Sequence, residues 1–310
     1  MTLPPLLRDR LSLPLIGSPM FIISQPDLVI AQCRSGIVGA FPSLNARPAG
    51  MFESWLQQLG EALGESDAPF AVNLIVHRTN SRLEEDLALC VRYRVPIVIT
   101  SLGAREDVND AIHSYGGIVL HDVINNVFAR KAVEKGADGL IAVAAGAGGH
   151  AGTLSPFALI QEIRAWFDGP LALSGSIATG RAIAAARMMG ADLGYMGTPF
   201  IATEEANAQA AYKQMIVDGS AQDIVYSDVF TGVLGNYLRP SIVAAGLDPD
   251  ALPKAKDMDF ASLTGGEKKA WRDVWGAGQG IGAIAKVQPA ADFIAGLKAD
   301  YRAAVEGFTA

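Results

Sequence analysis

The feature that most constrains this chain is the alternation of short apolar runs with amphipathic stretches. The apolar runs are four to seven residues long and apolar throughout, which is typical of parallel strands covered on both faces. They lie at residues 13–17, 37–41, 70–76, 96–101, 117–121, 139–143, 170–174 and 193–196. Between them, apolar residues recur three and four apart, which predicts helices at 27–33, 51–63, 82–93, 106–114, 125–135, 156–167 and 179–189. Glycines just past these stretches predict left-handed helix caps at Gly36, Gly64, Gly116, Gly136 and Gly190.

Eight strand candidates that alternate with helices predict an α/β fold, the (β/α)8 TIM barrel. A doubly wound sheet is the competing fold. It usually has fewer strands and places a glycine-rich phosphate turn after the first strand. Here the first turn reads Gly17-Ser18-Pro19-Met20, which lacks that pattern, so the sequence favours the barrel.

After the eighth run the pattern loosens. Helices are expected at 204–217 and 290–305, with a mixed segment between them that contains Pro240, Pro249 and Pro253. We therefore predict a barrel over residues 1–219, a mixed helical insertion or lid over the barrel mouth at 220–288, and a C-terminal helix at 289–310 that packs back on the barrel.

Composition excludes several classes of protein. Half of the residues are hydrophobic, which argues against disorder, and 25 Lys and Arg against 32 Asp and Glu give a net charge of −7. An acidic chain has no electrostatic footprint for nucleic acid or for anionic membranes. Two cysteines, no signal-peptide pattern and no membrane-length apolar run predict a cytoplasmic protein. No metal-binding motif, P-loop or serine-hydrolase motif is present.

The strongest candidate for a site is the glycine-rich segment 144–153, directly after the sixth strand. Active sites of barrels lie at the carboxyl ends of the strands, and glycines there expose backbone to a ligand. His150 is the one ionisable side chain in this segment and can act as an acid or base. The alternative is that His150 only braces the loop.

Two further loops carry small residues ahead of helices, Ser174-Gly175-Ser176 and Gly197-Thr198. Loops seven and eight form the usual phosphate site of this fold, because free N–H groups and a helix dipole favour an anion. Ordinary helix capping by Ser176 and Thr198 is the alternative. Asn73 is a polar residue inside the apolar run 70–76 and is a further candidate for the pocket. Other candidates follow strand ends or lie in turns: Met20, His77, His121 and, near the C-terminus, Gln279.

These motifs together resemble the nitronate monooxygenases. The resemblance rests on Gly17-Ser18-Pro19-Met20, Val72-Asn73, Gly148-Gly149-His150-Ala151-Gly152, residues 174–180, Gly190-Ala191-Asp192, residues 196–200 and Ala277-Gly278-Gln279-Gly280. It implies an FMN-dependent barrel without a metal, with Ser174, Gly175, Ser176, Gly197 and Thr198 at the phosphate. Asn73 and Met20 would contact the isoalloxazine, Gly148 and Gly149 would lie along it, and Gln279 would approach it. His150 would remove the α-proton of a nitroalkane, and O₂ would oxidise the nitronate to a carbonyl compound and nitrite.

The chain also departs from that pattern. The fifth strand ends His121-Asp122 where family members have a Lys after the His, Pro199 replaces an Arg, and Ser176 replaces a Gly. Less positive charge near a flavin disfavours its anionic reduced form. An NAD(P)H:quinone reductase, an FMN-dependent enoyl-thioester reductase, a flavin-free sugar-phosphate barrel and a binding protein therefore stay open. So do the substrate, the roles of His77, His121 and Asp122, and a homodimer as the assembly.

Overall fold

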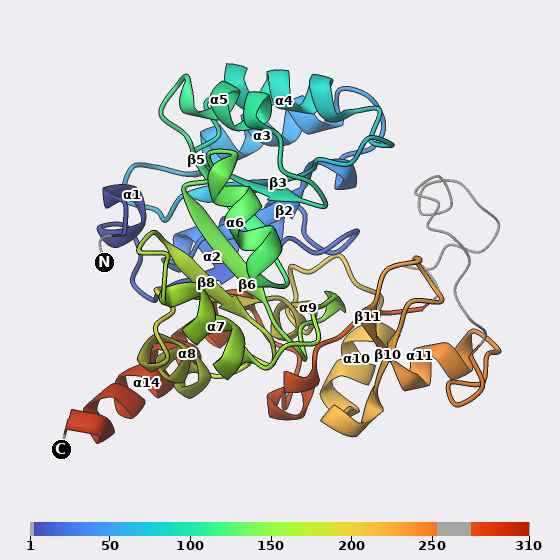
Figure 1. Ribbon diagram of the computed structural model, residues 1–310. Coiled ribbons are helices and arrows are strands. Elements are labelled where there is room, and N and C mark those ends of the chain that lie inside the picture. Colours follow the sequence, from blue (N-terminus) through green and yellow to red (C-terminus); the bar gives the residue numbers. More distant parts are fainter. Residues whose placement is uncertain (1–2, 253–273, 310) are drawn as a thin grey trace.

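The computed structural model describes residues 3–252 and 274–309, and its centre is an eight-stranded parallel sheet closed on itself (Figure 1). The strands are β1 (Leu15–Gly17), β2 (Gly39–Pro42), β3 (Phe70–Ile75), β4 (Ile97–Ser101), β5 (Ile118–Val123), β6 (Gly139–Val143), β8 (Leu171–Ser174) and β9 (Leu193–Met196). Their order is β1-β9-β8-β6-β5-β4-β3-β2. The Gly17 N–H donates to Val38 O at 2.7 Å and closes β1 onto the β2 side. The predicted barrel is confirmed.

The seven predicted helices of the barrel all form. They are α2 (Pro26–Arg34), α3 (Met51–Ala62), α4 (Leu83–Arg92), α5 (Glu106–His113), α6 (Asn126–Glu134), α7 (Pro156–Arg164) and α8 (Gly180–Met188). Of the predicted glycine caps, Gly36, Gly116, Gly136 and Gly190 have positive φ and Gly64 does not. The chain leaves α3 in extended conformation at Leu63, so Gly64 needs no left-handed turn.

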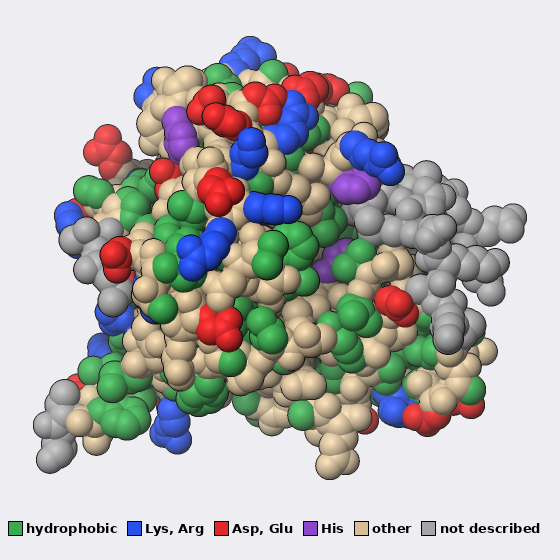
Figure 2. Space-filling view, viewed as in Figure 1, with side chains coloured by type: hydrophobic (Ala, Val, Ile, Leu, Met, Phe, Trp, Pro, Cys, Tyr) green, Lys and Arg blue, Asp and Glu red, His purple; other side chains and the backbone are tan. Residues whose placement is uncertain are grey.

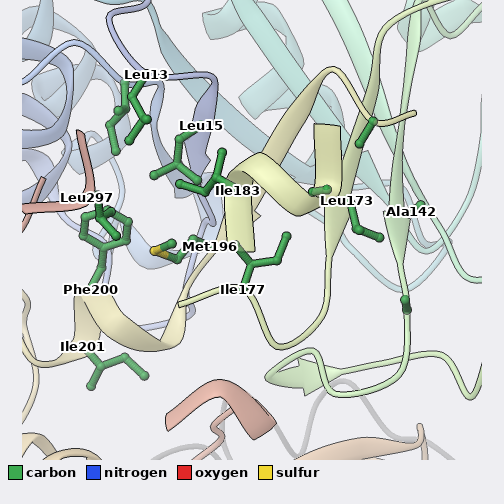
Figure 3. Close-up of a cluster of buried hydrophobic side chains, with 14 of the residues drawn as sticks. Leu13, Leu15, Ala142, Leu173, Ile177, Ile183, Met196, Phe200, Ile201 and Leu297 are labelled. Atoms are coloured by element: carbon green, nitrogen blue, oxygen red, sulfur yellow. The ribbon is translucent and has the colours of Figure 1, made fainter. Parts of the chain in front are cut away.

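The side chains divide into three main buried clusters because successive strand residues point to opposite faces. Residues such as Ile16, Ala71 and Tyr195 fill the barrel interior. The outward faces pack on α3, α4 and α5 on one side and on α6, α7, α8 and α14 (Ala290–Thr309) on the other. Figure 3 shows part of the second cluster, where Leu15 and Met196 point toward Ile183.

The chain beyond β9 lies along one side of the barrel (Figure 1). It comprises α9 (Thr198–Ile201), α10 (Ala210–Asp218), β10 (Ile224–Ser227), β11 (Gly235–Leu238), α11 (Arg239–Ala244), the 3-10 turn η3 (Gln279–Ala283) and α14. Strands β10 and β11 form an antiparallel sheet with β7 (Gly149–His150), which the sequence did not predict. Residues 253–273 of the predicted lid segment lie outside the described residues, and the division at 219 and 288 stays a prediction.

The predicted helix 204–217 is wrong over its first six residues, because α10 begins at Ala210. The preceding segment is held by α14 instead. The Glu205 carboxylate accepts from the Ala290 N–H at 2.9 Å, and Glu204 N–H donates to Gln288 O at 3.1 Å. None of the described helices is long and apolar enough to cross a membrane.

Candidate active site

A cavity of about 1370 Å³ opens at the carboxyl ends of the barrel strands. Figure 2 shows hydrophobic side chains gathered around a hollow on this face. The walls come from strand ends of the barrel, from the glycine-rich segment after β6 and from the chain around β11. Most of the predicted site residues line this cavity: Met20, Asn73, Gly148, Gly149, His150, Ser174, Gly197 and Thr198.

Gly175, Ser176 and Gln279 do not line the cavity. The Gly146 carbonyl, in the loop after β6, accepts from the N–H groups of Ser176 at 3.3 Å and of Gln279 at 2.9 Å. The start of η3 and the loop after β8 thus share one acceptor, and Gly175 packs against Ala145 beside it. The Gly278 N–H likewise donates to Thr198 Oγ1 at 2.8 Å. Some of the polar groups in the predicted phosphate loops are therefore already hydrogen-bonded within the protein.

The walls of the cavity suit a flat ligand such as FMN. A Cβ on Gly197 would lie 3.3 Å from Ser18 Cβ and 3.4 Å from Met20 Sδ, so a larger residue at this position would crowd this wall of the cavity. Hydroxyls of Ser174 and Thr198 line the same cavity and can donate to a phosphate. The cavity exceeds the roughly 300–1,000 Å³ of ordinary small-molecule pockets, so it has room for a flavin and a substrate. The residues present fit FMN.

His150 is held at the cavity by the small sheet beside the barrel. In β7 it pairs with Gly235 of β11, and its Nε2 lies 3.1 Å from Thr231 Oγ1. The Thr231 hydroxyl donates to Val233 O at 3.0 Å, so it can accept from His150 Nε2 in the tautomer that carries its hydrogen there. Burial lowers the pKa of His150 to about 4, because an imidazolium is poorly solvated there. The imidazole is neutral at pH 7.

A chain of polar groups crosses the cavity floor inside the barrel. Asn73 Nδ2 of β3 donates to Ser101 Oγ of β4 at 2.7 Å, and Ser101 Oγ donates to Asp122 Oδ2 of β5 at 2.6 Å. Burial raises the pKa of Asp122 to about 6, against the hydrogen bond from Ser101 that lowers it. Burial, followed by the charge of Asp122, raises the pKa of Tyr195 well above its ordinary value.

Sequence reasoning missed Ser101 and Tyr195 and left Asp122 without a role. A weak signal existed, since Ser101 is a polar residue that ends an apolar run, as Asn73 is a polar residue inside one. Strand register explains the contact. Asn73 pairs with Ile99, so Ser101 lies two residues farther along β4 and on the same face of the sheet as Ile99. Asp122 follows His121, the partner of Thr100, so it lies beside Ser101.

The other two histidines at this end also line the cavity. The prediction that His121 follows the fifth strand is wrong, because β5 continues to Val123. His121 Nδ1 lies 2.6 Å from Thr100 Oγ1, and burial lowers its pKa to about 4. His77 follows β3 as predicted, with Nδ1 2.8 Å from Thr79 Oγ1. Across the described residues, no three His, Cys, Asp or Glu side chains meet in a way that could hold a metal ion.

Similarity to known proteins assigns this barrel to a family. The family model described as nitronate monooxygenase matches residues 7–300. The chain belongs to the nitronate monooxygenase family. It is an oxidoreductase of that family, and the resemblance found from the sequence motifs is confirmed. Members of the nitronate monooxygenase family are flavin-dependent enzymes that act on small molecules.

Relatives within and near the nitronate monooxygenase family differ in what they act on. A nitronate monooxygenase of Paraburkholderia phytofirmans is 25% identical, covering 94% of this chain and 93% of its own. A dehydrogenase of a hydroxy-methyl-oxo-octahydroindene-carboxyl-CoA from Rhodococcus jostii is 25% identical over 74% of this chain and 64% of its own. Among solved structures, a FabK variant from Thermotoga maritima has a TM-score of 0.80 at 25% identity, covering 98% and 96% of the chains.

Proposed function

We propose that this protein is an FMN-dependent oxidoreductase of the nitronate monooxygenase type. It oxidises alkyl nitronates, and neutral nitroalkanes after loss of a proton, with O₂ to a carbonyl compound and nitrite. The observation that carries the proposal is a neutral imidazole, His150, on the wall of a flavin-sized cavity in a chain of this family. Ser174 and Thr198 would hold the phosphate, and Met20, Asn73, Gly148 and Gly149 would border the ring system.

In this proposal the protein binds, orients and deprotonates, while bound FMN supplies the redox chemistry with O₂. His150 takes the α-proton of a neutral nitroalkane, and Thr231 orients the ring by its contact with Nε2. A preformed nitronate has already lost this proton, so its oxidation does not require His150 as a base. Buried apolar residues such as Ile23 and Ile201 also line the cavity and limit the access of water to the substrate.

The test is the visible spectrum of the purified protein, followed without oxygen as reductants are added. FMN is first supplied in excess and the unbound flavin removed. The proposal expects flavin bands that propionate 3-nitronate bleaches and that neither NADH nor NADPH bleaches. Protein that shows no flavin band after this treatment contradicts the flavin dependence itself.

A second function is favoured by the size and character of the cavity. A small nitronate needs little of about 1370 Å³, and the rim carries exposed apolar side chains, with Ile124 40%, Leu234 42% and Phe128 48% exposed. Such a rim suits a bulky apolar substrate, as for an enoyl-thioester or quinone reductase that uses NAD(P)H. Bleaching of the flavin bands by a nicotinamide alone would assign the protein to these reductases.

A further inference from the structure

The cavity floor contains one buried polar atom that the fold does not satisfy, the Oδ1 of Asp122. The atom is shielded from solvent and has no hydrogen-bond partner, although Asp122 lines the cavity. A buried polar group without a partner destabilises a protein by about 1–3 kcal/mol, so such groups in native structures call for an explanation. Ligand contact is the explanation that the position of Asp122 supports.

The hydrogen bonds of the floor fix which carboxyl oxygen can carry a proton. Asn73 Nδ2 can only donate, so the Ser101 hydroxyl accepts from it, and it donates its own hydrogen to Asp122 Oδ2. With this bond in place Oδ2 is an acceptor. Oδ1 is the atom that holds the proton when the carboxyl is neutral.

The surroundings favour the neutral acid. The groups that bear on Asp122 are Ser101 of β4, Asn73 of β3 and the Tyr195 phenol of β9, and none of them is a cation. His121, next to it on β5, faces the other side of the strand and bonds to Thr100. The charged residues that line the cavity lie on α6 and before β11, namely Lys131, Glu134, Lys135 and Asp228. None of these contributes to the pKa shift of Asp122, which burial raises to about 6.

We propose that Asp122 is a ligand-contacting residue that, as the neutral acid, donates a hydrogen bond from Oδ1 to an acceptor atom of the flavin bound over the barrel floor. The proposal rests on the proposed function, since it takes FMN as the ligand. It goes further than the proposed function because it assigns a specific hydrogen-bond donor to the flavin, the carboxylic acid of Asp122, which Ser101 and Asn73 hold in place. A carboxyl kept neutral in an apolar site is a strong hydrogen-bond donor, and with a pKa of about 6 Asp122 is mostly in this form below pH 6.

The test measures the affinity of the whole protein for FMN, by quenching of flavin fluorescence, at pH 5, 6, 7 and 8. The variants are Asp122→Asn, which keeps an N–H donor but cannot ionise, and Asp122→Val, which has no donor. Asp110→Asn is the control, because it removes an exposed carboxylate of α5 that does not line the cavity. The FMN phosphate itself titrates near pH 6, so the result is the difference between each variant and the wild type at each pH.

The expected result is an affinity of the wild type that falls about tenfold more between pH 5 and 8 than that of Asp122→Asn. At pH 5, Asp122→Val should bind FMN about tenfold more weakly than the wild type, which is the effect of one lost hydrogen bond to a buried partner. Asp110→Asn should follow the wild type throughout. Identical pH dependence and affinity in all four proteins would overturn the proposal.

A second measurement separates this proposal from the proposed function. If none of the four proteins binds FMN at any pH, the flavin assignment fails, and the state of Asp122 is then read directly. The ¹³C carboxyl signal of Asp122, identified by its loss in Asp122→Asn, is titrated in the protein without ligand. A midpoint at pH 6 or above supports the neutral acid, and a midpoint near pH 4 overturns it.

Discussion

At the scale of single residues, the buried carboxyl of Asp122 resists ionisation and destabilises the folded protein when it is ionised. Burial raises the pKa of Asp122 from its ordinary value to about 6, so folding favours the protonated form. The stability that this contributes is complete below pH 4 and is lost as pH rises through 6. Between pH 5 and 8 we expect the wild type to lose about 1 kcal/mol of unfolding free energy that Asp122→Asn does not lose. Urea unfolding at the two pH values measures this difference, with Asp110→Asn as the control, and equal losses in all three proteins contradict it.

His150 predicts a different pH dependence, since a base is active only when neutral. With a pKa of about 4, the imidazole of His150 is protonated, and so cannot accept a proton, only as the pH falls through 4. The titration of His150 should therefore leave kcat/KM for a neutral nitroalkane unchanged between pH 5 and 8. His150→Asn should lower that kcat/KM by about 10² to 10⁴-fold and leave oxidation of preformed nitronates nearly unchanged. His113→Asn, a half-exposed histidine of α5, is the matched control. An equal loss on both substrates would show that His150 does more than accept a proton.

Single residues also mark the limit of what the sequence could predict about the site. His150 stood out because one ionisable side chain among glycines after a strand is unusual. Ser101 and Asp122 did not stand out, because they contact each other only through the pairing of neighbouring strands. The sequence does not specify the register of that pairing. The predicted phosphate residues show the same limit. Gly175 and Ser176 lie in the expected loop, but Gly146 and the distant Gln279 take up the space beside them.

At the scale of elements, helix α14 depends on a close crossing with α8. A Cβ on Gly180, the first residue of α8, would overlap Leu297 O and the Tyr301 N–H. Gly180→Ala should therefore destabilise the protein by about 1–3 kcal/mol, because the two backbones must separate. Gly296→Ala is the matched control in α14, where a Cβ meets nothing within 4 Å and alanine favours the helix. Urea unfolding should show opposite signs for the two variants, and a neutral Gly180→Ala contradicts the crossing.

Elements with a strong periodic signal were predictable, and those without one were not. Buried strands such as β4 read as apolar runs, and the barrel helices carry an apolar stripe, so both can be recognised locally. Strand β7 is two residues long, Gly149 and His150, and exists only because β11 pairs with it. The start of α10 was misplaced because Glu205 caps α14 rather than extending its own helix.

At the scale of the whole molecule, the C-terminal part of the chain returns to the barrel mouth and contacts the loops that a phosphate would need. The Gly278 N–H bonds to Thr198, and the Gln279 N–H bonds to Gly146. Binding of a phosphate there requires these contacts to rearrange, or else the phosphate is held by the Ser174 and Thr198 hydroxyls that face the cavity. Either way, a ligand that bridges the barrel and this returning segment should stabilise the entire fold.

This linkage can be measured as a shift in the melting temperature. At 100 times its Kd, FMN should add about 2.7 kcal/mol to the unfolding free energy, which for a chain of 310 residues corresponds to about 4 °C. Riboflavin has the same ring system without the phosphate and is the matched ligand. At equal concentration it should give a smaller shift, because Ser174, Thr198 and the loops around them lose their partner. Equal shifts would show that the ring system alone is recognised and would contradict the phosphate site, while the ring contacts of Met20 and Asn73 would stand.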